Sequence, residues 1–497
     1  MRIATNVSAI VSNNALQKSQ DRLTKSIARL SSGYKINSSS DDAAGYAISE
    51  KMRLQLRGLN QADNNAADGV SVLHTAEGAM EEIQSMLARM KELSVQAANG
   101  TNSVDERSAI QSEIDSLNSE IDRISSNTEF NSQTLISGNL SRRVYSNYEG
   151  VNQIEVSDNF VAGNYGITIT QDARQAIVVG NGAVTMSDTA TVTKEQAGTI
   201  SMNGYGIEIS EGDTLAGIMG KLVDGADKIG GRVFAITAGA TNDTKVNGTD
   251  YAGYEPQTSY AGNNIVFMTK ESGSSKTMNI TCSNAELANM LGIATAATNS
   301  GMYAEGSDVQ AEFTLDNDGK RVGFADSAVI STSGTRVTVK DVNNRTFVTD
   351  VPSNVAGTQF SDTAKADDKS TATSTQTAKV TQEVTDVGTM SVHVGANENQ
   401  VILIDIPAVT SYTLGTENLN VMTSVTASEA IDTIDTAVAY ANRVRSQMGA
   451  YENRFEHTTN NLGTASENLT SAISTMTDTD MAEEMTEYTS LNVMTQA

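Results

Sequence analysis

Few residues of the chain have the type and spacing that chemistry requires. The three histidines, His74, His393 and His457, are scattered, and none stands at a metal-ligand spacing. The sequence contains no His-Glu-x-x-His, no G-x-x-x-x-G-K-[ST] and no G-x-S-x-G, the patterns of zinc proteases, phosphate-binding loops and serine hydrolases. We therefore expect no enzyme, no metal site and no cofactor.

Two acidic pairs and one cysteine are the other candidates. Asp41-Asp42 stands where a helix is expected to begin, so helix capping explains it better than a cation site. Glu483-Glu484 is interpreted as a solvated or intersubunit face. Cys282 is the only cysteine, which excludes an intrachain disulfide and a thiolate metal cage and favours a buried structural thiol.

Length and charge limit the class of protein. A chain of 497 residues is too long for one core, and its net charge of −26 disfavours nucleic acid and anionic membrane surfaces as partners. No stretch reaches membrane-spanning length without polar interruption. The N-terminus lacks an apolar core long enough for a cleaved secretory signal, so we expect either a cytoplasmic protein or export without cleavage.

The two ends of the chain are Pro-free, helical in pattern and oppositely charged. Residues 1–35 hold six Lys/Arg against one acid, a net charge of +5, and residues 457–497 hold six acids and no Lys or Arg, a net charge of −6. Both ends carry apolar residues at coiled-coil spacing: Leu16, Leu23, Ile27 and Leu30 at one end, and Leu462, Leu469, Ile473 and Met476 at the other. Because a narrow stripe cannot bury itself, each arm needs partner helices from its own chain or from neighbours.

Further helices are predicted inside the arms. Apolar periodicity predicts a helix from about residue 41 to 98, capped by Ser40 or Asp41 and broken near Gly58 or Gly69. A second helix is predicted over 104–126, and helix returns near Ser424. The rows on these helices, such as Met80 and Leu87, are typical of a bundle.

The middle of the chain has a different pattern. From about Asn139, short alternating runs are separated by Gly, Asn, Asp and Ser, which indicates strands and turns. The Ser/Thr-rich segment 361–379 is interpreted as a flexible linker or exposed loop, where glycosylation is plausible. The predicted fold class is therefore α+β, with helices at both ends and β-rich domains inserted between them.

The helical ends resemble flagellin, the subunit of the bacterial flagellar filament. The resemblance covers roughly residues 1–145 and 390–497. Its most specific carriers are Asn13-Asn14-Ala15-Leu16, the segment Arg89 to Asn102, Ser466-Glu467-Asn468-Leu469-Thr470 and Asp480-Met481-Ala482-Glu483-Glu484. The insert resembles, more weakly, modules of flagellar cap proteins, through residues 199–204 and 212–218.

This resemblance implies four structural parts. They are an inner coiled-coil domain (1–40 and 460–497), a helical bundle with a β-hairpin (41–145 and 395–459), an outer β-rich domain (146–300) and a second outer β unit (301–394). It also implies helical self-assembly for motility, with the arms ordering on polymerisation. The implied location is the extracellular filament, reached through the flagellar type III channel.

The implied partners follow from the same resemblance. They are copies of the chain itself, an export chaperone on the C-terminal arm, and the cap and junction proteins of the flagellum. Arg89, Leu93 and Glu113 match positions through which flagellins are recognised by the animal Toll-like receptor 5. Arg89, Glu92 and Glu113 could equally pair with neighbouring subunits or form a solvated surface.

One departure and two alternatives accompany this interpretation. Flagellins usually continue for several more apolar-striped turns after Glu487-Tyr488-Thr489, whereas this chain stops at Ala497, which predicts a shortened chain or an unusual inner layer. A hook–filament junction protein shares the coiled-coil ends and predicts a short terminal assembly. An adhesin or glycan-binding role of the acidic insert predicts ligand binding by residues 150–390.

Overall fold

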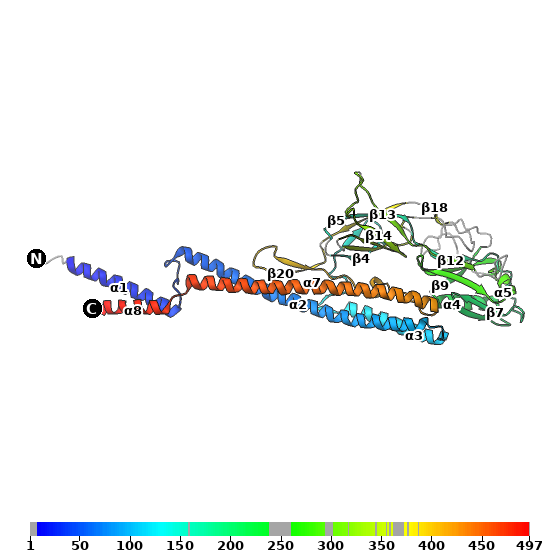
Figure 1. Ribbon diagram of the computed structural model, residues 1–497, viewed down its shortest axis with the longest axis horizontal. Helices are drawn as coiled ribbons and strands as arrows, with labels where there is room; N and C mark the ends of the chain where they lie inside the picture. The colour runs from blue at the N-terminus through cyan, green and yellow to red at the C-terminus, as the bar shows by residue number, and fades with distance from the viewer. Residues whose placement is uncertain are drawn as a thin grey trace. The chain divides into compact units, whose positions relative to one another are not determined.

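The structure of the protein is a computed structural model (Figure 1). It describes residues 7–157, 160–237, 260–293, 302–316, 318–342, 345–353, 355–356, 359–360, 372–374, 377–385 and 387–496. Most of the linker predicted over 361–379 lies outside these residues, although its last two positions, 378 and 379, begin a strand.

The chain forms two compact units. Unit 1 comprises residues 1–74, 391–404 and 449–497, and unit 2 comprises residues 75–390 and 405–448. The elements of unit 1 are α1 (Val7–Ser32), the first part of α2 (Ala43–Ala98), the hairpin β20 (Met390–His393) with β21 (Val401–Ile404), the last part of α7 (Ser424–Thr477), and α8 (Met481–Gln496).

Helix α2 runs without the predicted break at Gly58 or Gly69. Both glycines are instead places of close approach within unit 1. A Cβ at Gly58 would lie 3.0 Å from the Cβ of Ala396 in the β20–β21 hairpin, and a Cβ at Gly69 would lie 2.9 Å from the ring of Phe455 on α7. The absence of a side chain lets neighbours pack closely, and the surrounding contacts keep the helix continuous.

The start of α2 also differs from the prediction. Oδ1 of Asp42 accepts hydrogen bonds from the backbone N–H groups of Ala44 and Gly45, both at 3.0 Å, so Asp42 is the N-cap rather than Ser40 or Asp41. The carboxylate of Asp41 instead accepts from the backbone of the preceding loop, which lowers its pKa. Both carboxylates of this acidic pair therefore accept backbone hydrogen bonds, Asp42 from the first turn of α2 and Asp41 from the loop before it.

Unit 2 contains a helical part that matches the predicted bundle pattern. It is formed by the rest of α2 and the start of α7, with α3 (Val104–Asn127), α6 (Ser411–Leu414) and the hairpin of β1 (Glu129–Phe130) and β2 (Gln133–Thr134). Ser103 and Glu106 form a capping box at the start of α3. Met80 and Leu87 of the predicted row are fully buried.

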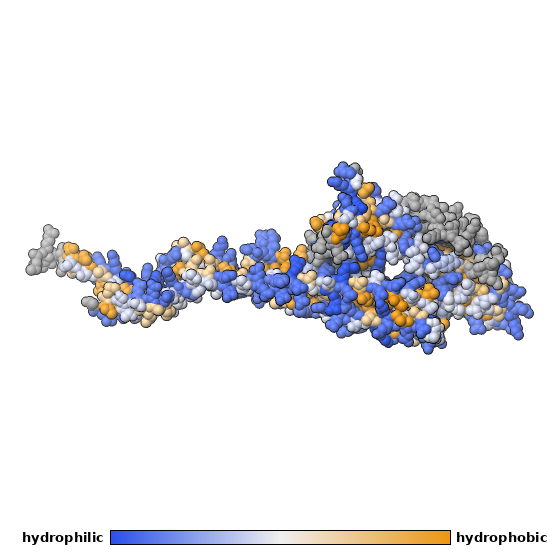
Figure 2. All heavy atoms as spheres, in the orientation of Figure 1, coloured by the Kyte–Doolittle hydropathy of each residue, from blue (hydrophilic) through white to orange (hydrophobic). Residues whose placement is uncertain are grey.

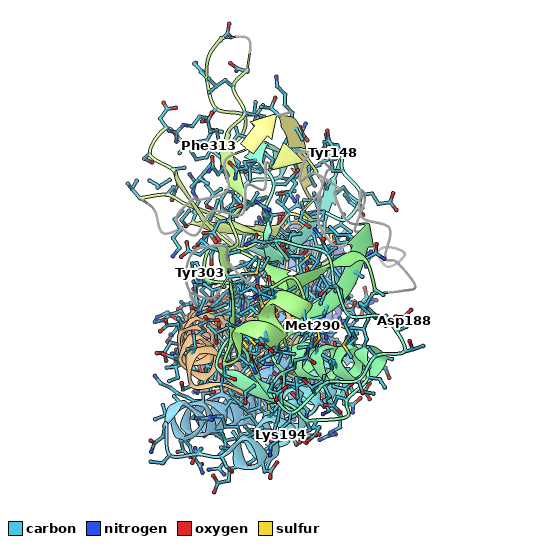
Figure 3. The ribbon with its side chains drawn as sticks, turned by 90° about the vertical axis from the view of Figure 1, so that its right-hand side faces the viewer. Tyr148, Asp188, Lys194, Met290, Tyr303 and Phe313 are labelled. Atoms are coloured by element: carbon cyan, nitrogen blue, oxygen red, sulfur yellow. The ribbon has the colours of Figure 1, made fainter. Side chains whose placement is uncertain are left out.

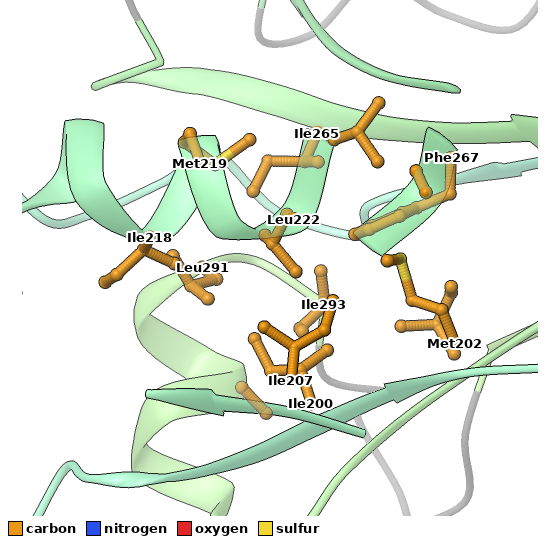
Figure 4. Close-up of a cluster of buried hydrophobic side chains, with 14 of the residues drawn as sticks. Ile200, Met202, Ile207, Ile218, Met219, Leu222, Ile265, Phe267, Leu291 and Ile293 are labelled. Atoms are coloured by element: carbon orange, nitrogen blue, oxygen red, sulfur yellow. The ribbon is translucent and has the colours of Figure 1, made fainter. Parts of the chain in front are cut away.

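The first β module of unit 2 has a core that lies between a helix and two antiparallel sheets (Figure 4). One sheet has the order β6-β10-β9 and the other the order β12-β11-β7-β8. The strands are β6 (Gln175–Val179), β7 (Gly198–Met202), β8 (Tyr205–Ile209), β9 (Gly231–Thr237), β10 (Asn263–Ser272), β11 (Thr277–Cys282) and β12 (Met302–Glu305). Helices α4 (Leu215–Lys228) and α5 (Ala285–Met290) complete the module, and Phe267 is fully buried in it.

The second β module has two further four-stranded antiparallel sheets around one core. Their orders are β13-β5-β19-β3 and β14-β15-β16-β4. The strands are β3 (Val144–Ser146), β4 (Asn152–Val156), β5 (Gly163–Gln171), β13 (Gln310–Phe313), β14 (Val329–Ser333), β15 (Arg336–Lys340), β16 (Thr346–Asp350) and β19 (Ala378–Val384); β17 (Gln359–Phe360) pairs with β18 (Ala372–Ser374). Phe160, Tyr165, Phe324 and Phe347 meet at its centre, with ring centroids 5.1–6.3 Å apart.

The order of elements, helices then strands then helices, confirms the predicted fold class. The residues of the β-rich middle are divided between the two β cores in a way that the sequence did not indicate. Residues 151–173 pack with residues 309–384, and residues 176–302 form the other core. The division into four domains, with its boundary at residue 300, stays a prediction.

Candidate functional site

The terminal helices α1 and α8 pack against each other within unit 1. The guanidinium of Arg22 lies 3.0 Å from the carboxylate of Glu487, and that of Arg29 lies 3.6 Å from Glu484. Since the later residue of α1 meets the earlier residue of α8, the two helices run antiparallel. The charges of the two ends therefore meet across this pair.

Backbone hydrogen bonds hold the two helices in register where they begin and end. The N–H of Lys35 donates to the carbonyl of Thr477 at 2.6 Å, and the N–H of Thr479 donates to the carbonyl of Gly33 at 3.0 Å. Gly33 has a φ of 76°, in the left-handed region that glycine adopts without strain, so it ends α1 and turns the chain.

The predicted seam residues are divided between two places. On α1, Leu23 and Leu30 are partly buried, while Leu16 and Ile27 remain 41% and 48% exposed. The four C-terminal seam residues, Leu462, Leu469, Ile473 and Met476, lie on α7 and not on α8. In that part of unit 1, the α7 residue Ser466 donates to Asn60 of α2 at 3.3 Å. The coiled-coil role predicted for these two sets of residues stays a prediction.

Much of the apolar surface of the terminal helices is uncovered (Figure 2). Val7 and Val11 on α1 are 66% and 60% exposed, and Val493 and Met494 on α8 are 60% and 54% exposed. A helix with this much apolar surface is incomplete until a further partner covers it. The exposed apolar residues of α1 and α8 therefore form a surface suited to binding a further partner.

The predicted receptor or intersubunit patch lies on α2 and α3 of unit 2. Arg89 forms ion pairs with Glu113 at 2.9 Å and with Glu92 at 3.1 Å, and these hydrogen bonds raise the pKa of Arg89. Arg89 and Glu113 are exposed, whereas Leu93 is 2% exposed and belongs to the core. The structure therefore brings the two charged residues together on the surface and places Leu93 in the core.

Comparison with known proteins agrees with these terminal helices. A model of the bacterial flagellin N-terminal helical region matches residues 3–141, and a model of the bacterial flagellin C-terminal helical region matches residues 431–497. A flagellin of Clostridium tyrobutyricum is 31% identical over 498 residues, covering 98% of this chain and 95% of that relative. The chain belongs to the flagellin family.

Other relatives match over similar lengths. Flagellin B of Vibrio anguillarum is 28% identical, covering 100% of this chain and 94% of the relative. A flagellin of Salmonella typhimurium strain LT2 is 29% identical, covering 100% and 95%. As a flagellin-family member, the chain is a structural subunit of the bacterial flagellar filament, which serves motility.

The three histidines that were considered as metal ligands lie on α2, on α7 and in the β20–β21 hairpin of this flagellin-family chain. His74 and His457 are exposed, and Nε2 of His74 lies 3.5 Å from the carboxylate of Glu452. Nδ1 of His393 lies 2.8 Å from the carbonyl of Gln400 within the β20–β21 hairpin. No helix in the described ranges is both long and apolar enough to cross a bilayer.

The structure also shows the surroundings of Cys282 and of the acidic pair Glu483-Glu484. Cys282 is partly buried, burial raises the pKa of its thiol, and Sγ donates to the carbonyl of Asn284 at 3.2 Å. Glu484 is the partner of Arg29, while Glu483 is exposed. The intersubunit role suggested for this pair from the sequence is untested.

Sequence reasoning missed a polar joint between the β insert and the helical part of unit 2. Glu155 of β4 pairs with Arg443 of α7 at 2.6 Å, and Arg142 pairs with Asp405 at 3.6 Å. Glu155 is buried, and burial raises its pKa, although Arg443 opposes the shift. These partners stand hundreds of positions apart in the chain, so no local pattern could have revealed them.

Further contacts complete this joint. The guanidinium of Arg336 donates to the carbonyls of Tyr412, at 2.5 Å, and Thr413, at 3.1 Å. The hydroxyl of Tyr412 donates to Asp350 at 2.6 Å, and the pKa of Tyr412 is raised to about 12 by burial and by this carboxylate. The insert is thus held to the helical part by several ionic and hydrogen-bonded contacts.

Proposed function

We propose that this chain builds an open-ended flagellar filament through its terminal helices. The observation that carries the proposal is the α1–α8 pair, whose charges are partly matched while apolar residues such as Val11 and Val493 stay exposed. Copies of the chain would cover those residues when they pack side by side. Each Å² of apolar surface that is buried between copies would stabilise the filament by about 25 cal/mol, and this free energy would drive growth.

The terminal helices order fully only on assembly in this proposal. Isolated helices with a narrow apolar stripe are marginal in water, so the cost of ordering is met when neighbours pack against them. Loosely ordered ends would also keep the subunit thin for passage through the flagellar type III channel, without a cleaved signal. A chaperone would cover the acidic C-terminal helix until export, and the junction and cap proteins would bound the filament.

The division of labour among the four predicted parts belongs to the same proposal. Residues 1–40 with 460–497 would form the inner layer, 41–145 with 395–459 the layer around it, and 146–300 and 301–394 the outer surface. The β modules have their own hydrophobic cores, which supports an outer position that needs no neighbour.

Recognition by Toll-like receptor 5 is a further part of the proposal. Arg89 and Glu113 form an exposed ion pair, so their charged groups are accessible in the free chain. Leu93 would act indirectly, by supporting α2 beneath that pair. Loss of receptor activation in Arg89→Ala, with Arg123→Ala as the matched control on α3, would test this role.

The filament proposal is tested by seeded growth. Purified chain is incubated with short filament fragments and imaged by electron microscopy, beside a chain lacking residues 1–35. We expect long filaments from the intact chain and none from the shortened one. The control is Tyr148→Ala, which should leave growth unchanged because it alters the insert and not the terminal helices. Tyr148 is exposed, and Figure 3 shows it well separated from Tyr303, another exposed tyrosine of the insert.

Two other results would contradict the proposal. Short terminal assemblies from the intact chain would favour a hook–filament junction protein instead. Filaments that form equally well without residues 1–35 would show that the terminal helices do not drive growth.

A further inference from the structure

Three Asn-Gly pairs lie within the described ranges, at residues 99–100, 181–182 and 203–204. An asparagine that precedes glycine can lose its side-chain amide without an enzyme. The backbone nitrogen of the glycine attacks the side-chain carbonyl carbon of the asparagine, because no Cβ obstructs the approach. A fourth pair, at residues 247–248, lies outside the described residues. Whether a pair reacts depends on how the fold holds the attacking nitrogen and the amide.

The fold restrains two of the three described pairs. Asn203 has a φ of 48° in the turn between β7 and β8. Its Nδ2 donates to the carbonyl of Thr277 at 2.7 Å, and its Oδ1 accepts from the N–H of Asn279 at 2.7 Å. In the pair at 181–182, the backbone nitrogen of Gly182 donates to the carbonyl of Gly292 at 3.2 Å. Attack in either pair therefore requires hydrogen bonds to break first.

The pair Asn99-Gly100, in the turn between α2 and α3, is much less restrained. Both residues are exposed, and a Cβ at Gly100 would meet no described atom within 4 Å. The backbone nitrogen of Gly100 and Nδ2 of Asn99 donate no hydrogen bond to the described residues. The attacking nitrogen and the leaving amide can therefore react without breaking any such bond.

Two hydrogen bonds at this turn favour the attack. The N–H of Thr101 lies 3.3 Å from Oδ1 of Asn99, so it stabilises the negative charge that forms on this oxygen when the carbon is attacked. The guanidinium of Arg107 donates to the backbone carbonyl of Asn99 at 3.0 Å. That carbonyl and the N–H of Gly100 belong to one peptide unit, so the positive charge makes this nitrogen easier to deprotonate.

We propose that Asn99 is a site of spontaneous deamidation in the folded chain, promoted by Arg107 and by the N–H of Thr101. The nitrogen of Gly100 bonds to Cγ of Asn99, the Cγ–Nδ2 bond breaks, and Nδ2 leaves as ammonia with the proton that the Gly100 nitrogen gave up. Water then opens the five-membered imide at either carbonyl and leaves an aspartate or an isoaspartate at position 99. This modification goes beyond the proposed filament function and does not depend on it.

Either product would change the turn between α2 and α3. A carboxylate at position 99 places a negative charge just after the end of α2, where the helix dipole favours positive charge. An isoaspartate runs the main chain through the former side-chain carbons and converts the carbonyl bonded by Arg107 into a free carboxylate. Older copies of the chain would therefore differ from new copies at this turn.

The first experiment compares the three pairs in one molecule. The full-length chain is incubated at neutral pH and digested, and the asparagine, aspartate and isoaspartate forms of each peptide are measured by mass spectrometry. Asn99 should convert at least about tenfold faster than Asn181 and Asn203, because hydrogen bonds restrain the other two pairs. In guanidinium chloride the three rates should approach one another. Equal rates in the folded chain, or no conversion at Asn99, would overturn the proposal.

Two variants test the mechanism, each checked for folding by circular dichroism before incubation. Gly100→Ala should fold as the parent does, because Gly100 has no left-handed φ and the added Cβ has open space. Its methyl group should slow conversion at Asn99 by about tenfold or more, and an unchanged rate would exclude attack by this nitrogen.

Arg107→Met should slow conversion at Asn99 by about fivefold, because it removes the charged donor on the Asn99 carbonyl. The control is Arg123→Met, which removes an exposed arginine of the same helix and should leave the rate unchanged. A rate in Arg107→Met equal to or above that of the parent would overturn the promoting role of Arg107.

Discussion

Two helices of the molecule bury very different shares of their residues. Helix α1 has 26 residues, of which one, Ser26, is buried. Helix α4 has 14 residues, of which six are buried against the sheets of its module. Since helix stability in proteins comes mainly from packing of an apolar face, α4 is complete within one chain and α1 is not. The difference separates a helix whose apolar face is buried within the chain from a helix whose apolar residues stay largely exposed.

The largest expected effect concerns the core around α4. Phe267→Ala removes a fully buried ring from the core around α4 and should lower the free energy of unfolding of that module by about 3–5 kcal/mol. Chemical denaturation followed by circular dichroism measures it. Ile27→Ala on α1, 48% exposed, is the control and should change stability by about 0.5 kcal/mol or less. Equal losses of stability in Phe267→Ala and Ile27→Ala would contradict the view that α4 is packed within the chain and α1 is not.

A smaller loss is expected at the polar joint. Arg443→Met leaves the carboxylate of Glu155 buried without its partner and should cost about 3 kcal/mol at neutral pH. Glu155→Gln together with Arg443→Met should recover most of that loss. A double-mutant cycle in urea gives the coupling, and a cost below about 0.5 kcal/mol would show that the joint contributes little.

The pH dependence of this joint has a definite sign. Burial raises the pKa of Glu155 above its ordinary value of 4.5, so the folded chain keeps that proton to a higher pH than the unfolded chain does. The stability contributed by Glu155 is full below pH 4.5 and falls as the pH rises through the raised pKa. The deficit of Arg443→Met should therefore shrink as the pH is lowered towards 4.5, and a deficit that grows on acidification would contradict this sign.

An effect of about 1 kcal/mol is expected at the α1–α8 pair. Arg29→Met removes the partner of Glu484, whose side chain is 8% exposed, and should speed hydrogen exchange in α1 and α8. Arg22→Met is the matched control, because both side chains of the Arg22–Glu487 pair are well exposed and such pairs contribute little. Equal exchange in the two variants would mean that burial of Glu484 has no consequence.

The smallest effect on the free subunit should come from its exposed apolar residues. Val11→Asp should change the free energy of unfolding by about 0.5 kcal/mol or less, since Val11 is 60% exposed. The same variant should prevent seeded filament growth, measured by light scattering. A destabilised monomer, or normal growth, would contradict the view that α1 is completed only by other copies.

Local patterns in the sequence were enough to predict the helical ends, the β-rich middle and the opposite charges of the two arms. Apolar period, turn residues and charge act over a few neighbouring positions, so the start of α7 at Ser424 and the row through Met80 and Leu87 were predictable. The N-cap of α2 was misplaced by one or two positions, because three adjacent residues could all cap a helix and only their hydrogen bonds distinguish them.

Only the tertiary structure decided how distant segments combine. Gly58 and Gly69 looked like helix breaks and are instead packing points, since their neighbours come from residues more than 300 positions away. The polar joint and the sharing of strands between the two β cores depend in the same way on long-range contacts. The sequence by itself determined the periodicity and charge of each element. The fold determined which elements meet, because burial and ion pairing depend on distances that no short stretch of sequence contains.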